Sequence, residues 1–193
     1  MEAKTQAEAT KQLFESLTHL YVQARQLLVD CDRPMGERGW EPIGSYALQD
    51  IIVTAHSPKK WFARWAARFY LAQTGSEQDE TVKALRFVSL HFCSDEDTQV
   101  VEPLVIAGIY VIANPLKRQK VKDTNKYHWI CKSWFYALPE HGKKLCEWYD
   151  WVPGAREREG LPEGKIASFA VPLYDIKSSK ELEKMVIDAL FSK

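Results

Sequence analysis

Cations and aromatic rings recur every four residues in the segment 58–71, which the sequence predicts to be a helix. On that helix Lys60, Arg64 and Arg68 line one ridge, and Trp65 lies on an aromatic ridge beside it. Cations that contact phosphates and flat rings that stack on bases are what a surface for single-stranded nucleic acid needs. A helix that packs its rings on a sheet and keeps its charges in water has the same pattern. We expect the packed helix and hold nucleic-acid binding as the alternative.

A second group of cations lies in the polar segment 114–126, which we predict to be an exposed hairpin loop. Lys117, Arg118 and Lys120 are its candidates for contact with phosphate groups. A solvated hairpin tip has the same composition, and we expect that role. The two basic segments would act together only if the fold placed them on one face, and the sequence leaves that open.

The second half of the chain is rich in aromatic residues, in a predicted strand over 127–138 and in the segment 148–151. Residues of alternate parity point to opposite faces of a strand, so both faces of this strand should carry large rings. One set fills the core, and the other needs a cover: the segment 148–151, a partner protein or a flat ligand. A wide aromatic core with a loop folded over it explains the same residues, and the residues alone favour it. The candidate ligand-binding residues are Trp129, Trp134, Tyr136, Trp148 and Trp151.

Residues suited to catalysis or metal binding form no recognisable set. The chain has 4 Cys, and no two of them have the C-x-x-C spacing. His91 and Cys93 should share one face of a strand, whereas His128 and Cys131 should point to opposite faces. Glycine-rich phosphate loops, the nucleophile elbow and the zinc-protease motif are absent from the sequence. We therefore predict no metal and no cofactor, assign no catalytic residue, and leave open whether the protein is an enzyme.

A tryptophan lies in the segment 32–42, which two Pro and two Gly residues predict to be a loop. Trp40 stands there between Glu37 and Glu41. The loop is either the rim of a pocket or a plain connection, and we expect the connection.

Hydrophobic spacing, Gly and Pro predict the elements that position these residues. Helices and strands are followed by a last helix with a capping box that begins at Ser178. Pro172 is typical of an edge position for the last strand. Helices are predicted over 6–31, 45–56 (where a strand also fits) and 58–71, and strands over 83–93, 100–113, 127–138 and 165–173.

Runs of helices followed by runs of strands indicate an α+β fold with N-terminal helices, a mostly antiparallel sheet of about four strands and a C-terminal helix. We expect the helices on one face of the sheet. The chain is treated as a single domain over 1–193, helical over 1–75 and containing the sheet and the last helix over 76–193.

The apolar segment 104–111 has hydrophobic residues in both alternating sets. Such a strand is covered on both faces, so it is either central or sealed at a subunit interface. A homodimer is therefore a hypothesis.

The 193 residues include 26 Lys and Arg and 26 Asp and Glu, so the formal net charge is zero. A balanced charge argues against a protein whose whole surface binds nucleic acid or anionic lipid. The first residues are polar and the longest apolar run is too short for a membrane helix, so the sequence predicts a cytoplasmic protein without a membrane segment.

These observations favour a non-catalytic binding or regulatory domain. Its aromatic-rich sheet face would hold a protein partner or a small flat ligand. The alternative is an accessory protein that binds nucleic acid through the basic and aromatic segment 58–71 and the basic loop.

Overall fold

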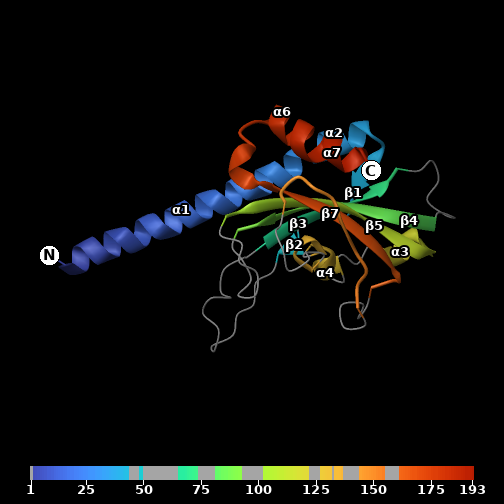
Figure 1. The fold of residues 1–193 in the computed structure, drawn as a ribbon. Helices are drawn as coiled ribbons and strands as arrows, with labels where there is room; N and C mark the ends of the chain where they lie inside the picture. The colour runs from blue at the N-terminus through green and yellow to red at the C-terminus, as the bar shows by residue number, and fades with distance from the viewer. Residues whose placement is uncertain are drawn as a thin grey trace.

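A computed structural model of the chain contains a twisted antiparallel sheet with helices on both faces (Figure 1). The structure describes residues 2–43, 48–49, 65–73, 81–92, 102–121, 127–131, 133–136, 144–154 and 161–193. Every strand pair in it is antiparallel. The predicted α+β class and antiparallel sheet are confirmed, and the sheet is larger than expected.

Seven strands form the sheet. Six follow the order β1-β3-β4-β5-β7-β6, and β2 pairs with β3 beside β1. Their bounds are Trp40–Pro42 (β1), Leu48–Gln49 (β2), Trp65–Ala72 (β3), Thr81–His91 (β4), Leu104–Lys117 (β5), Tyr149–Trp151 (β6) and Gly164–Pro172 (β7).

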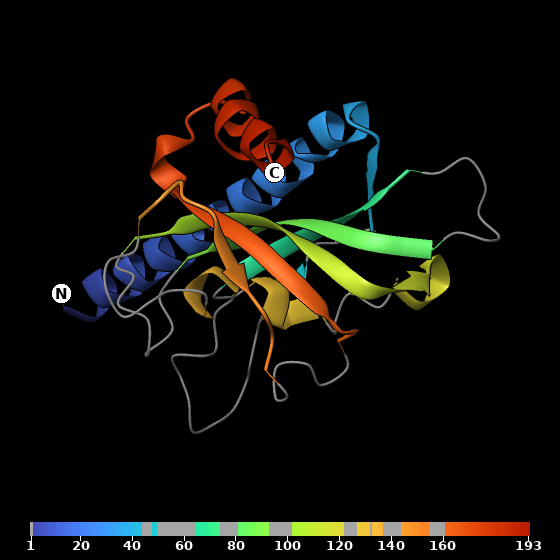
Figure 2. The same ribbon diagram turned by 45° about the vertical axis from the view of Figure 1, so that its right-hand side comes forward.

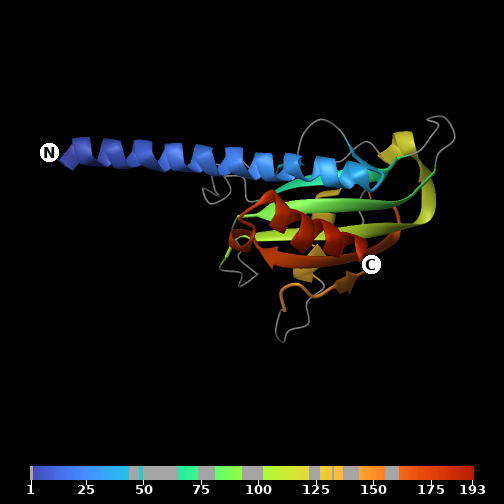
Figure 3. The same cartoon turned by 90° about the horizontal axis from the view of Figure 1, so that it is seen from above.

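One face of the sheet is covered by the first and the last helices of the chain, and the C-terminal part of the first helix lies beside the last one there (Figure 2). These are α1 (Glu2–Asp30), α2 (Asp32–Glu37) and a continuous C-terminal helix made of α6 (Ser179–Leu182), η4 (Glu183–Asp188) and α7 (Ala189–Phe191). A 3-10 turn, η3 (Leu173–Asp175), leads from β7 towards that helix. Figure 3 shows that α1 runs far beyond the sheet at its N-terminal end.

The opposite face is covered by the short helices α4 (His128–Cys131) and α5 (Ser133–Tyr136). A further short helix, α3 (Arg118–Val121), follows β5 at the end of the sheet. The expectation of helices on one face only was wrong. The strands bury apolar side chains on both faces, and each face therefore needs its own cover.

The central strand β5 separates two hydrophobic cores. Leu104 and Ile106 belong to the core under α4 and α5, and Val105 and Ala107 belong to the core under α1 and the C-terminal helix. All four are buried within one chain, which confirms the central position predicted for this strand. A second copy is not needed to seal it.

The predicted helix over 58–71 was wrong where the structure describes it. Residues 65–72 form β3, which pairs with β4 on one side and with β1 and β2 on the other. Trp65 and Phe69 pack in one core and Tyr70 in the other, so both faces of the strand are apolar. Pairing on both sides outweighs the local helical spacing, because strand formation depends on the neighbouring strands. Lys60 and Arg64 lie outside the described residues.

Four other predictions were wrong. The segment 127–138 forms α4 and α5 rather than a strand, the loop over 32–42 contains α2 and β1, and the basic segment after Lys117 begins the helix α3. β7 is not an edge strand, because it lies between β5 and β6. Pro172 is tolerated there because it is the last residue of the strand. In the segment 45–56 only β2 is described, and it is a strand.

The elements with strong local signals were predicted correctly. The long first helix is α1, and the hairpin predicted over 83–93 and 100–113 is β4 and β5. Ser178 caps the C-terminal helix, since its Oγ accepts a hydrogen bond of 3.2 Å from the Glu181 amide.

Candidate functional site

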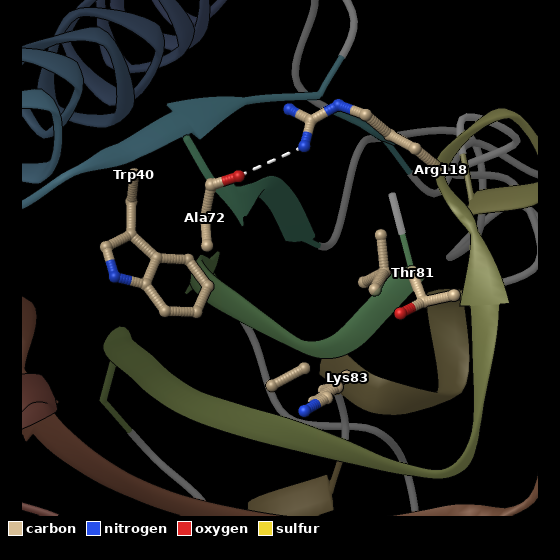
Figure 4. Close-up of a pocket in the computed structure, with 7 residues that line it drawn as sticks. Trp40, Ala72, Thr81, Lys83 and Arg118 are labelled. Carbon is tan, nitrogen blue, oxygen red and sulfur yellow. Dashed lines mark hydrogen bonds between the residues drawn. The ribbon is translucent and has the colours of Figure 1, made fainter. Parts of the chain in front are cut away.

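A pocket of about 290 Å³ opens at the end of the sheet where β4 begins and β5 ends (Figure 4). In this view Trp40 lies on one side of it, Arg118 and Thr81 lie on the other, and Lys83 lies between them. The lining residues are Trp40, Ala72, Thr81, Val82, Lys83, Ala84 and Arg118.

A left-handed turn and a strand pair position Trp40. Gly39 has a φ of 76°, which glycine adopts without steric cost, and the chain turns there from α2 into β1. Trp40 is then opposite Ala72 at the end of β3, and the Gln73 amide donates to the Gly39 carbonyl over 2.7 Å. The indole is thereby fixed beside the pocket.

A change of register between β4 and β5 makes room for the pocket. Val82 is opposite Leu116, but Ala84 is opposite Val111, so that Lys83 faces the segment 112–115. Irregularities of this kind re-aim side chains at the margins of sheets. Lys83 is exposed there, at the rim of the pocket.

Two cations of the lining differ in how they are held. Arg118 donates to the Ala72 carbonyl over 3.0 Å and forms an ion pair with Glu41. Its side chain is therefore fixed in the pocket wall, and Glu41 largely neutralises its charge. Lys83 forms no ion pair in the part of the chain that the structure describes. Its ammonium group is therefore the cation that a ligand can reach.

Trp40 is held from the helical face by an arginine between two rings. The guanidinium carbon of Arg86 lies 4.8 Å from the centroid of the Trp40 ring and 4.0 Å from that of Phe191. Arg86 also donates to the Leu190 carbonyl near the end of the C-terminal helix. Its buried Nε has no hydrogen-bond partner among the described residues, and burial lowers the pKa of the guanidinium from its usual value.

Two residues predicted to bind nucleic acid are internal. Arg68 is only 8% exposed, and its Nε and Nη2 donate to the two carboxylate oxygens of Asp32 over 2.8 and 2.6 Å. The hydrogen bonds to Asp32 raise the pKa of Arg68. Trp65 is buried in the core under α4 and α5, where it stacks on His91. Arg68 and Trp65 point to opposite faces of β3 and do not form one surface.

Of the three basic residues at and after the end of β5, Arg118 lines the pocket. Lys117 ends β5 opposite Thr81, and Arg118 and Lys120 lie on α3. Lys117 and Lys120 are exposed. Thr81 and Arg118 line the pocket, so these two lysines lie near it without lining it.

The aromatic residues predicted to bind a ligand lie on both sides of the sheet. Trp134 of α5 is buried in the core between that helix and the sheet, with its ring edge-on to that of Tyr149. Trp151 packs against the same core. Trp148 belongs to the other core, with its ring centroid 4.7 Å from that of Phe169. Trp129 and Tyr136 are residues of α4 and α5. Trp134 and Trp148 therefore do not face one common cavity.

A buried polar group connects α4 and α5 to the sheet. Nε2 of His91 lies 3.1 Å from the Ser89 hydroxyl and 2.9 Å from the Cys131 carbonyl. The hydroxyls of Ser133 and Ser168 are joined over 2.9 Å. These contacts use polar groups that face the core, so they anchor the helices.

Within the described ranges, no three His, Cys, Asp or Glu residues converge as a metal site would require. None of the helices described is long and apolar enough to cross a membrane. The chain matches no protein-family model, no curated protein and no solved structure.

Most of this pocket is not predictable from the sequence. Trp40 was considered for a pocket rim, but a plain connection was expected, and that expectation was wrong. Thr81 and Lys83 carried no signal, because the change in register depends on how β4 pairs with β5. Of the basic residues predicted to contact phosphate, Arg118 lines the pocket, and it belongs to a helix instead of the expected loop.

Proposed function

We propose that the protein is a non-catalytic binding domain whose pocket beside Trp40 takes a small, flat, anionic molecule. The observation that carries this proposal is the exposed ammonium group of Lys83, which has no ion pair in the described structure and stands at a pocket with an indole in its wall. A cation next to an aromatic and apolar wall suits a ligand that has a planar part and a negative group.

The walls are compatible with a ring system of modest size. Ala72, Val82 and Ala84 are small or apolar, and Trp40 adds a flat face. The volume is close to the lower end of the range for small-molecule pockets. Arg118 is already paired with Glu41, so it shapes the wall more than it attracts the ligand.

The composition of the lining favours binding over catalysis. Among the described residues that line the pocket there is no histidine, cysteine or carboxylate. Proton transfer and nucleophilic attack mostly use those side chains. A cytoplasmic location remains part of the proposal, and the free thiols of Cys31, Cys131 and Cys146 support it.

Nucleic-acid binding is the second candidate function, and one observation favours it. Lys117 is opposite Thr81 of the pocket lining and Lys120 follows Arg118 on α3, so two further exposed cations lie near the pocket. A nucleotide within a single strand would place a base against the indole and phosphates against the lysines. The two candidates thus share one recognition chemistry and differ in ligand length.

The test is calorimetric titration with AMP, adenosine and inorganic phosphate at low salt. AMP should bind in the micromolar to millimolar range and more tightly than either fragment, because only AMP has both a ring and a charge. Lys83→Ala should weaken AMP binding about fivefold, which is the loss of about 1 kcal/mol from one exposed charge-assisted contact. Lys180→Ala removes an exposed lysine of α6 outside the pocket and should change nothing.

Equal affinities for AMP and adenosine, or an unchanged affinity in Lys83→Ala, would contradict the proposal. A single-stranded oligonucleotide titrated under the same conditions separates the two candidates. Binding much tighter than that of AMP and steeply weakened by salt would move nucleic acid to first place.

A further inference from the structure

The N-terminal half of α1 extends beyond the sheet with apolar side chains in water. Figures 1 and 3 show several turns of this helix projecting past the sheet. Leu13 and Phe14 in that part are 65% and 58% exposed. Large apolar side chains adjacent on one helix face usually mark a surface that contacts another element.

The apolar residues of α1 follow the repeat of a coiled coil. Their spacing alternates between four and three residues, which keeps them on one seam of the helix. The seam residues are Leu13, Leu17, Leu20, Ala24 and Leu27, with Phe14, Tyr21 and Leu28 along one flank. We call this set the α1 seam.

The C-terminal half of the α1 seam is already occupied by the chain's own sheet. Ala24 and Leu28 are buried in the core of the helical face, and Tyr21 contacts the ring of Phe92 edge-on. Leu17 and Leu20 are half-buried, so the seam passes from this packed half to the exposed Leu13. The free half of the seam is Leu13 and Leu17, with Phe14 on its flank. The free half ends where α1 reaches the edge of the sheet (Figure 3).

We propose that the free half of the α1 seam pairs with the same segment of a second copy of this chain, with the two helices antiparallel. A parallel copy would bring its own sheet to the place where the first sheet already covers the seam. An antiparallel copy puts the two sheets at opposite ends of the helix pair. Such a pair has a two-fold axis, and the same residues then line both sides of the interface.

Charge favours a second copy over a different partner. Ser16 and Gln23 flank the seam without charge, whereas helices that select a distinct partner place charges at such positions. Lys11 and Glu15 lie outside the seam and form an ion pair of 3.9 Å with each other. The net charge of the chain is zero, so two copies do not repel each other.

The mass of the full chain in solution tests this interface. Light scattering after gel filtration at tens of micromolar should give twice the chain mass of 22.3 kDa. Leu13→Glu should halve that mass, because it places a charge in the seam. Val22→Glu is the matched control: Val22 is 60% exposed on the same helix but points away from the seam, so this variant should keep the dimer mass.

A monomeric mass for the wild type, or an unchanged dimer for Leu13→Glu, would overturn the proposal. Leu13 lies outside both cores, so the thermal transition of the sheet should persist in Leu13→Glu and show that the monomer is folded. Gln6→Cys tests the direction of the helices. Antiparallel helices keep the two introduced thiols apart, and a rapid inter-chain disulfide at this position would indicate a parallel pair instead.

Discussion

Arg68 and Arg86 lie on neighbouring strands and point to the same face of the sheet, yet the fold surrounds them in opposite ways. The guanidinium of Arg68 meets the carboxylate of Asp32 through two hydrogen bonds, and the Tyr70 hydroxyl donates to the same carboxylate over 3.0 Å. Arg86 has no carboxylate partner in the described structure. Two aromatic rings and one backbone carbonyl hold it, and its Nε is unpartnered.

The difference separates a region whose charged groups are paired within the fold from a region that borders the pocket and can contact a ligand. Around Arg68 the charge is matched by Asp32, and two guanidinium nitrogens donate to its carboxylate, which is what a buried structural ion pair requires. Around Arg86 the cation is matched mainly by π-systems, and one of its rings, Trp40, also lines the pocket. We therefore expect changes near Arg68 to act on stability and changes near Trp40 and Lys83 to act on binding.

The largest expected effect comes from removing the carboxylate partner of Arg68. Asp32→Ala leaves a buried guanidinium without a counter-charge, and it should lower the free energy of unfolding by about 3 kcal/mol. Urea denaturation measures this change. Asp30→Ala is the matched control, since Asp30 is an exposed carboxylate of the preceding helix, and it should cost less than about 0.5 kcal/mol. Equal costs for the two variants would show that the Arg68 pair is not the stabilising contact.

The same region should lose stability at alkaline pH. Burial raises the pKa of the Cys31 thiol and of the Tyr70 hydroxyl above their ordinary values of 9.0 and 10.0. Both groups stay protonated in the folded state, so their stabilisation is complete below about pH 9 and is lost as the pH rises. Above their ordinary pKa values, the free energy of unfolding should fall by up to about 1.4 kcal/mol per pH unit for each group.

Urea denaturation between about pH 8 and 10.5 measures that slope. Cys31→Ala should flatten it from about pH 9 upward, because the buried thiol no longer titrates on unfolding. Cys146→Ala, which removes an exposed thiol, should leave it as in the wild type. A slope that Cys31→Ala does not change would contradict the assigned cause.

Sequence reasoning succeeded where the signals are local. The spacing of apolar residues in α1, the β-forming residues of β4 and β5 and the serine cap of the C-terminal helix all act within a few residues. It failed at β3, where the spacing of Arg64 and Arg68 suits a helix as well as a strand. The decisive partner of Arg68 is Asp32, which is 36 residues away.

The pocket depended even more on distant contacts. Trp40 lines a wall only because it pairs with Ala72, and Lys83 is aimed at the pocket only because β4 and β5 change register. The predicted parity of the aromatic segment 127–138 failed because α4 and α5 are single helical turns laid on a sheet face. The aromatic content was predictable, but the side of the sheet that each ring covers was not.

The smallest effect is expected for a change at Arg86. Arg86→Met keeps an unbranched apolar stem between Trp40 and Phe191 and removes both the charge and the unpartnered Nε. The lost bond to the Leu190 carbonyl and the lost ring contacts should together cost about 1 kcal/mol. Hydrogen exchange should become faster near the end of the C-terminal helix, at residues 189–191, while β3 keeps its protection.

Arg68 and Arg86 would not differ in their roles if Arg86→Met lowered the free energy of unfolding as much as Asp32→Ala. In that case Arg86 would stabilise the fold as much as the Arg68 pair does. Changes in the region behind Trp40 would then act on stability and not on binding. A cost near 1 kcal/mol with AMP affinity unchanged would instead separate the two roles: Arg86 would fasten the end of the chain, and the ligand would be held by Lys83 and the indole alone.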